Sequence, residues 1–127
     1  MYFRGFVEVY ASRYFIRWAK KERLSIEQLG SLSKAFLESA CVSLGSGLFK
    51  ARVPKAGNGK RGGYRFLFVA SDVACFLVFA FGKNEMANVN PDALKVLKLL
   101  AKDLLALNPD EIDRAVRLGK LRKLSSW

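Results

Sequence analysis

Val73 to Phe81, reading V-A-C-F-L-V-F-A-F, are the longest uninterrupted apolar run of the chain. The run is less than half of the roughly 20 residues that a transmembrane helix needs. It is rich in branched and aromatic residues, which favour strands, and it is apolar on both alternations. We therefore expect this strand to lie centrally in a sheet, with helices over one face and residues of the functional site bordering the other.

Two further strands precede this run. Phe49 to Val53 alternates strictly, so its apolar residues should face the core while Lys50 and Arg52 share the opposite face. Tyr64 to Ala70 follows a glycine-rich loop, and Ser71-Asp72 has the composition of a hairpin tip. The simplest arrangement of the three segments is an antiparallel meander.

The segment before the meander predicts a strand and two helices. Tyr2 to Tyr10 mixes aromatic and branched residues with single charges, which indicates a first strand. A short amphipathic helix should begin at Ser12. A second helix should begin at Ser25, which forms a capping-box pattern with Gln28, and should continue to Cys41.

The segment after the meander predicts two more helices. Asn90-Pro91-Asp92 and Asn108-Pro109-Asp110 each combine a capping residue, a proline at the first helical position and an acid in the first turn. The first helix should reach about Leu107, and the second should end at Gly119. We expect an α+β fold in a single domain over residues 1–127, with about 109–127 as a C-terminal helical extension.

The charge of the chain is concentrated in one stretch. The chain has 22 Lys and Arg against 11 Asp and Glu, a net charge of +11. Lys50 to Arg65 hold six cations and no carboxylate, and no acid occurs between Glu38 and Asp72. Such a stretch favours a phosphate backbone as the ligand. A membrane surface is the alternative, but its usual partner is a basic amphipathic helix, whereas this charge lies in a glycine-rich segment.

The N-terminal residues and the two cysteines indicate the cellular compartment of the protein. Arg4, Glu8 and Arg13 interrupt the N-terminal segment, so no signal-peptide core is present there. Cys41 and Cys75 fall in apolar patterns and should be small buried residues without a disulfide. We expect a cytoplasmic protein.

The absence of histidine limits the chemistry. It removes the commonest general acid and base and any zinc site built on histidine, and neither cysteine has a partner at metal-binding spacing. We expect no metal and no cofactor. Cleavage of RNA by its own 2′-hydroxyl remains possible, because positioning and cationic stabilisation supply most of the catalysis of phosphoryl transfer. A lysine within the cation cluster would have to act as the base or acid.

Three segments carry a family resemblance. They are Lys50-Ala51-Arg52, Gly57 to Arg65 (G-N-G-K-R-G-G-Y-R), and Phe81 to Glu85 (F-G-K-N-E), the last followed by the helix from Pro91. Together they resemble the RelE/ParE superfamily of bacterial toxins of type II toxin-antitoxin systems, in its HigB-like branch. The resemblance implies a small toxin with a curved antiparallel sheet that enters the ribosomal A site and cleaves messenger RNA.

The resemblance also implies roles for individual residues. Four cations take the catalytic positions: Lys50, Arg52, Arg65 and Lys83. The residues expected to contact RNA are Lys55, Lys60, Arg61, Tyr64, Asn84 and Glu85. The RelE type has an arginine directly after the last lysine and a base-stacking tyrosine near the start of the final helix, where this chain has Asn84 and Asn90. Tyr64 or Phe81 is then the candidate for base stacking.

Each of these residues also has a purely structural interpretation. Lys50 and Arg52 are then the solvated face of an edge strand, and Arg65 forms a structural ion pair with Glu85. Tyr64 fills a strand position, and Asn90 caps a helix.

The leading functional hypothesis is a ribosome-dependent mRNA interferase. The alternatives are a ParE-like toxin that inhibits gyrase and a non-catalytic RNA-binding protein of the same fold. The expected partners are the ribosome with its message and an acidic antitoxin, encoded adjacently and carrying a helix-turn-helix domain. We expect no membrane partner and a monomer when the antitoxin is absent.

Overall fold

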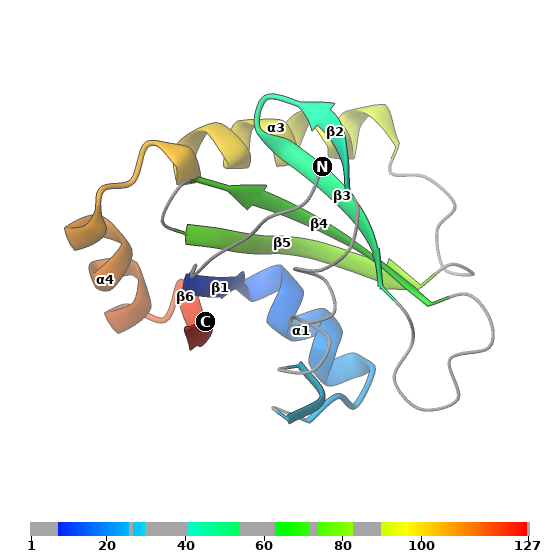
Figure 1. Ribbon diagram of the computed structural model, residues 1–127, viewed down its shortest axis with the longest axis horizontal. Helices are drawn as coiled ribbons and strands as arrows, with labels where there is room; N and C mark the ends of the chain where they lie inside the picture. Colours follow the sequence, from blue (N-terminus) through cyan, green and yellow to red (C-terminus); the bar gives the residue numbers. More distant parts are fainter. Residues whose placement is uncertain are drawn as a thin grey trace.

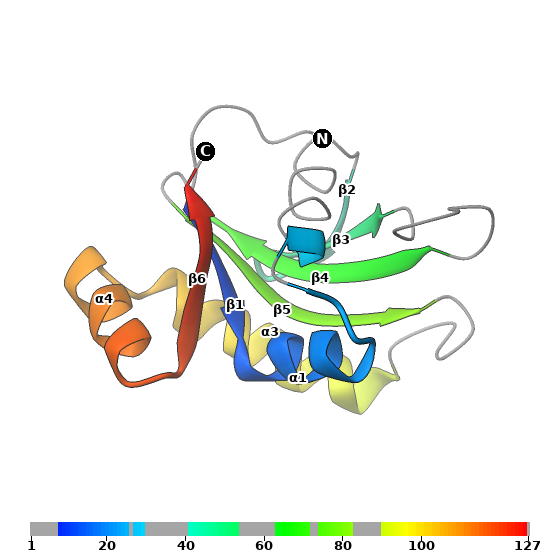
Figure 2. The same ribbon diagram turned by 90° about the horizontal axis from the view of Figure 1, so that it is seen from below.

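The computed structural model describes residues 8–25, 27–29, 41–53, 63–71, 74–82 and 90–126. They form a curved mixed sheet with helices on both faces (Figures 1 and 2). The elements are β1 (Glu8–Ser12), α1 (Arg13–Lys21), β2 (Cys41–Gly45), β3 (Leu48–Val53), β4 (Tyr64–Ala70), β5 (Ala74–Gly82), α3 (Pro91–Leu105), α4 (Pro109–Arg117) and β6 (Leu121–Ser126). The strand order is β2-β3-β4-β5-β1-β6.

The meander and its central strand confirm the α+β prediction. β3, β4 and β5 are antiparallel neighbours, and β5 lies between β4 and β1. The pair of β1 with β5 is parallel, with Val9 opposite Cys75, so the sheet is mixed and not wholly antiparallel as expected. The apolar pattern of a strand does not encode its direction, and the long connection between β1 and β5 permits either pairing.

The hairpin of β2 with β3 corrects the prediction of a helix that reaches Cys41. Cys41 begins β2 and pairs with Ala51 of β3. Gly45 and Gly47 have φ values of +92° and +82° and form the reversal between the two strands, a conformation that only glycine adopts without strain. The predicted capping box forms: Gln28 N donates to Ser25 Oγ at 3.0 Å and Ser25 N donates to Gln28 Oε1 at 2.7 Å.

The end of the chain corrects a second prediction, that of a helical extension. α4 and its end near Gly119 are as predicted, and Gly119 has a φ of +76°. Residues Leu121–Ser126 then return as β6, which pairs antiparallel with β1 and places Leu121 opposite Ser12. Without β6, β1 would be an open edge with unpaired backbone groups. Lys123 Nζ lies 3.1 Å from Glu8 Oε2 across this pair.

The two faces of the sheet have separate cores. α1 covers one face and α3 the other (Figure 1). Ser12 fixes the start of α1, because its Oγ accepts from Phe15 N at 3.2 Å and donates to the carbonyl of Val78 in β5 at 2.8 Å. Phe15 and Phe66 then meet edge to face on the α1 side, with ring centroids 5.0 Å apart. On the α3 side, Ala101 and Leu104 join the core that holds the apolar residues of β3, β4 and β5.

Both cysteines are free thiols. Cys75 is buried in the α1-side core, and Cys41 is partly buried against the same core. Burial raises the pKa of both thiols above the ordinary value. They therefore behave as the small apolar residues that the sequence predicts. In the described part of the chain, no helix combines the length and the apolar character needed to cross a bilayer.

Candidate functional site

Three cations lie on one face of the β3–β4 pair. Arg52 of β3 is directly opposite Arg65 of β4, and Lys50 is directly opposite Leu67 two residue pairs further along. Because alternate residues of a strand share a face, Lys50, Arg52 and Arg65 all lie on the same side of the sheet. These three residues are called the cation cluster below. Lys50 and Arg65 are partly buried and Arg52 is exposed.

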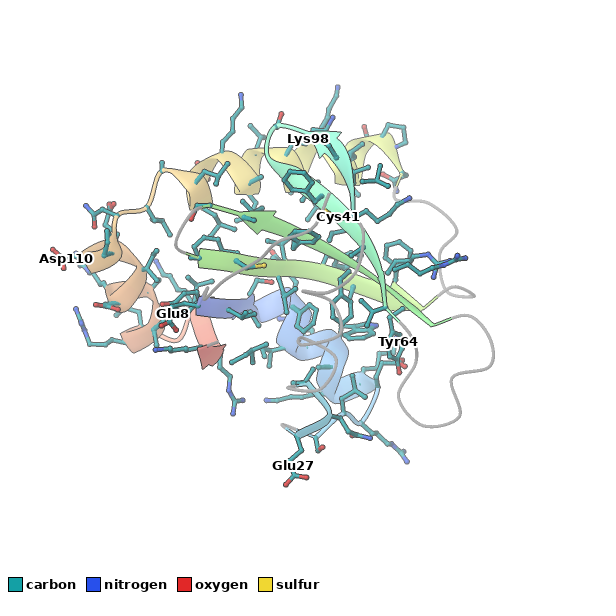
Figure 3. The ribbon with its side chains drawn as sticks, in the orientation of Figure 1. Glu8, Glu27, Cys41, Tyr64, Lys98 and Asp110 are labelled. Atoms are coloured by element: carbon teal, nitrogen blue, oxygen red, sulfur yellow. The ribbon has the colours of Figure 1, made fainter. Side chains whose placement is uncertain are left out.

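The cation cluster borders the layer that α3 forms. Leu48 and Leu67 belong to the same face and are fully buried in the α3-side core. Gly45 lies beside the side chain of Lys98 and Gly47 beside that of Leu105, so α3 runs toward the β2–β3 turn. Its N-terminal end therefore points toward the end of the sheet at which β3 ends and β4 begins (Figures 1 and 3).

The charge arrangement of the cation cluster is unfavourable for folding by itself. Like charges directly opposite each other on neighbouring strands destabilise the pair. Among the described residues, no carboxylate forms an ion pair with Lys50 or Arg52. Two guanidinium forks and an ammonium on one surface are well suited to bind the oxygens of a phosphodiester.

Six of the predicted site residues lie outside the described residues. They are Lys55, Lys60 and Arg61 of the segment between β3 and β4, and Lys83, Asn84 and Glu85 of the segment after β5. Within the described part of the chain, no group of three or more His, Cys, Asp or Glu is placed to hold a metal.

A model of the RelE toxin family, the RelE toxin of the RelE/RelB toxin-antitoxin system, matches residues 7–124. The chain belongs to the RelE toxin family. The match extends from the start of β1 into β6, so the segment after α4 is included in the family domain. No individual curated protein sequence matches the chain. As a RelE-family toxin, the protein has an antitoxin as its partner.

Tyr64 of this RelE-family toxin lies on the opposite face from Arg65. Its side chain is 4% exposed and meets Trp18 of α1 edge to face, with ring centroids 4.9 Å apart. Figure 3 shows Tyr64 on the α1 side of the sheet. A ring held in the core cannot stack on a base, so this position argues against the RNA contact expected for Tyr64. Phe81 shares the face of Arg65 but is also only 4% exposed.

Asn90 caps α3, as its structural interpretation predicts. Its Oδ1 accepts a hydrogen bond from Ala93 N at 2.8 Å, and Pro91 follows at the first helical position. The side chain is therefore used to satisfy a backbone donor of the helix end.

Replacing Asn90 by alanine should lower the free energy of unfolding by about 1 kcal/mol, because the first turn of α3 loses its capping acceptor. Asn90→Ser keeps an acceptor and should change this free energy by only a few tenths of a kcal/mol. Urea denaturation followed by circular dichroism measures both. A serine variant that is fully stable but cleaves RNA much more slowly would show that Asn90 does more than cap the helix.

Sequence reasoning assigned no role to a second group of cations, in α1 and around the start of β6. Arg13, Arg17 and Lys20 lie on α1, and they line one pocket with Lys120, which precedes β6, and Arg122 of β6. The sequence signal is the spacing of the α1 residues, three or four apart, which places them along one side of the helix. Their proximity to residues about 100 positions later depends on the pairing of β1 with β6.

Proposed function

We propose that this RelE-family toxin is a ribosome-dependent mRNA interferase, in the HigB-like branch of the family. The observation that carries the proposal is the pairing of Arg52 with Arg65 across β3 and β4, with Lys50 on the same face. A cationic surface attracts a phosphodiester and stabilises negative charge that develops on it. The partner in this proposal is an adjacently encoded acidic antitoxin with a helix-turn-helix domain, and the toxin alone is a monomer.

The proposed reaction is transesterification within the RNA. The 2′-oxygen attacks the neighbouring phosphorus, the bond from phosphorus to the 5′-oxygen breaks, and the products are a 2′,3′-cyclic phosphate and a 5′-hydroxyl. Arg52 and Arg65 neutralise the non-bridging oxygens, whose charge increases in the transition state. A guanidinium stays protonated, so proton transfer from the 2′-oxygen and to the 5′-oxygen falls to lysine. Lys50 is the lysine of the cation cluster, and Lys83 is the second candidate.

A non-catalytic toxin is the second candidate function. It is favoured by the burial of Tyr64 and Phe81, the two candidates for base stacking, and by the use of Asn90 as a cap. Such a protein would bind RNA or inhibit gyrase without cutting a message.

Toeprinting on a defined message in a purified translation system tests the proposal. Cuts should fall within the A-site codon of ribosome-bound message, and the same message free of ribosomes should be cleaved poorly. Stalled ribosomes on an uncut message would favour the non-catalytic function. Arrest of DNA replication in cells that continue to translate would instead indicate gyrase inhibition.

A further inference from the structure

A groove at the β6 edge of the sheet holds a second concentration of positive charge. It has a volume of about 640 Å³ and lies between α1, β6 and the turn that joins α4 to β6. Six cations line this α1–β6 groove: Arg13, Arg17, Lys20, Lys120, Arg122 and Lys123. Its other lining residues are mainly aliphatic: Ala11, Ile16, Val116 and Leu121. Among the described lining residues there is no carboxylate.

The groove is built by contacts that hold α1 against the end of the chain. Ser12, which ends β1 and caps α1, pairs with Leu121, which begins β6. Arg13 Nε donates to the carbonyl of Gly119 at 3.3 Å, so one cation is used to hold this junction. Lys123 is paired with Glu8. The remaining four cations are exposed, and in the described part of the chain no carboxylate forms an ion pair with them.

The lining distinguishes between two classes of anionic ligand. Proteins that bind single-stranded RNA usually add aromatic rings on which bases stack, and none of the described lining residues is aromatic. An acidic amphipathic peptide fits better, because its carboxylates can reach the cations while its apolar side chains cover Ile16, Val116 and Leu121. Because the chain belongs to the RelE toxin family, it has an antitoxin that must bind it.

We propose that the α1–β6 groove binds an acidic amphipathic segment of the antitoxin. The proposal rests on the toxin-antitoxin role of the protein and is independent of the cleavage chemistry. The groove and the cation cluster lie toward opposite edges of the sheet, because β5 and β1 separate β4 from β6. At about 4.8 Å per strand, β4 and β6 are about 14 Å apart. Antitoxin binding in the groove and RNA cleavage at the cation cluster should therefore be separable by mutation.

Fluorescence anisotropy with the full chain tests the proposal. The probe is a labelled synthetic peptide of about 15 residues, helical over about 22 Å, with glutamates along one face and leucines along the other. A scrambled peptide of the same composition and an oligouridylate of similar charge are the comparison ligands. The wild-type protein should bind the amphipathic peptide more tightly than either, and added salt should weaken this binding.

The double variant Arg17→Glu, Lys20→Glu should weaken binding of the amphipathic peptide at least about tenfold. The matched control, Lys95→Glu with Lys102→Glu on the exposed side of α3, changes the net charge equally and should alter binding less than about twofold. Thermal melting confirms that both variants are folded. An equal loss in the two variants, no peptide binding by the wild type, or equal binding of the scrambled peptide would overturn the proposal. Preference for the oligouridylate would make the groove an RNA site.

Message cleavage by the groove variant separates this proposal from the proposed function. The variant should cut ribosome-bound message at the wild-type rate, because α1 and the cation cluster lie on opposite faces of the sheet. If the wild type binds the amphipathic peptide but cuts no message, the interferase function fails and the groove proposal stands. Loss of cleavage in a folded groove variant would show that the groove serves the RNA substrate, and it would overturn the proposal.

Discussion

Arg65→Ala should lower the rate of message cleavage by about 100- to 1000-fold, the usual cost of removing one donor that stabilises transition-state charge. Arg65 lies on β4 directly opposite Arg52, so the two guanidinium groups can bind different oxygens of one phosphate. The alanine variant lacks the guanidinium N–H donors of Arg65 but keeps the backbone of β4 in place. The rate is measured under single-turnover conditions on ribosome-bound message, so that product release does not limit it.

Two further substitutions test whether the loss of activity comes from the guanidinium group of Arg65 or from the change in total charge. Arg65→Lys keeps the charge but loses the planar fork and should retain only part of the activity. Arg117→Ala, which removes one exposed cation from α4, should leave the rate within about twofold, because the screened charge is far from the site. Cleavage by Arg65→Ala at the wild-type rate would exclude the phosphate-stabilising role. An equal loss in Arg117→Ala would indicate that total charge, and not the cation cluster, sets the rate.

The central sheet could be predicted from the sequence because its signals are local. The run that becomes β5 is apolar on both alternations, and the structure covers it on both faces. The caps at Asn90 and Asn108 are equally local, because each needs only a side-chain acceptor and a backbone donor three residues later.

The edge strands could not be predicted, because other strands stabilise them. β6 reads L-R-K-L-S-S, with adjacent charges and no alternation, and it is a strand because it pairs with β1. β2 is short and ends in a glycine, and it depends in the same way on β3. Burial and pairing outweigh intrinsic propensity at such positions.

The candidate site also combines features that the local sequence predicts with features that depend on strand pairing. Alternation alone places Lys50 and Arg52 on one face, but the position of Arg65 opposite Arg52 depends on the register of β3 with β4. A shift of one residue would move every side chain of β4 to the other face. Tyr64 is different, because neighbours in a strand point to opposite faces. The sequence therefore already separates Tyr64 from the face of Arg65.

Phe66→Ala should lower the free energy of unfolding by about 3–5 kcal/mol, the usual cost of removing a buried aromatic ring. Phe66 is 0% exposed, and it lies in the α1-side core one position after Arg65. Its ring meets Phe15 at 5.0 Å and Trp18 at 5.9 Å between centroids, so it joins α1 to β4. The loss is a large part of the 5–15 kcal/mol that typically separates folded from unfolded proteins.

Urea denaturation measures this loss, with Val42→Ala as the control at a residue that is 59% exposed. The control should change the free energy of unfolding by no more than about 0.5 kcal/mol. A loss below about 1 kcal/mol in Phe66→Ala would mean that the core collapses around the missing ring. If the loss is as large as expected, α1 and the strand that carries Arg65 depend on one shared contact. The α1–β6 groove and the cation cluster would then both lose their geometry when this core is opened, although point changes in their own cations affect each separately.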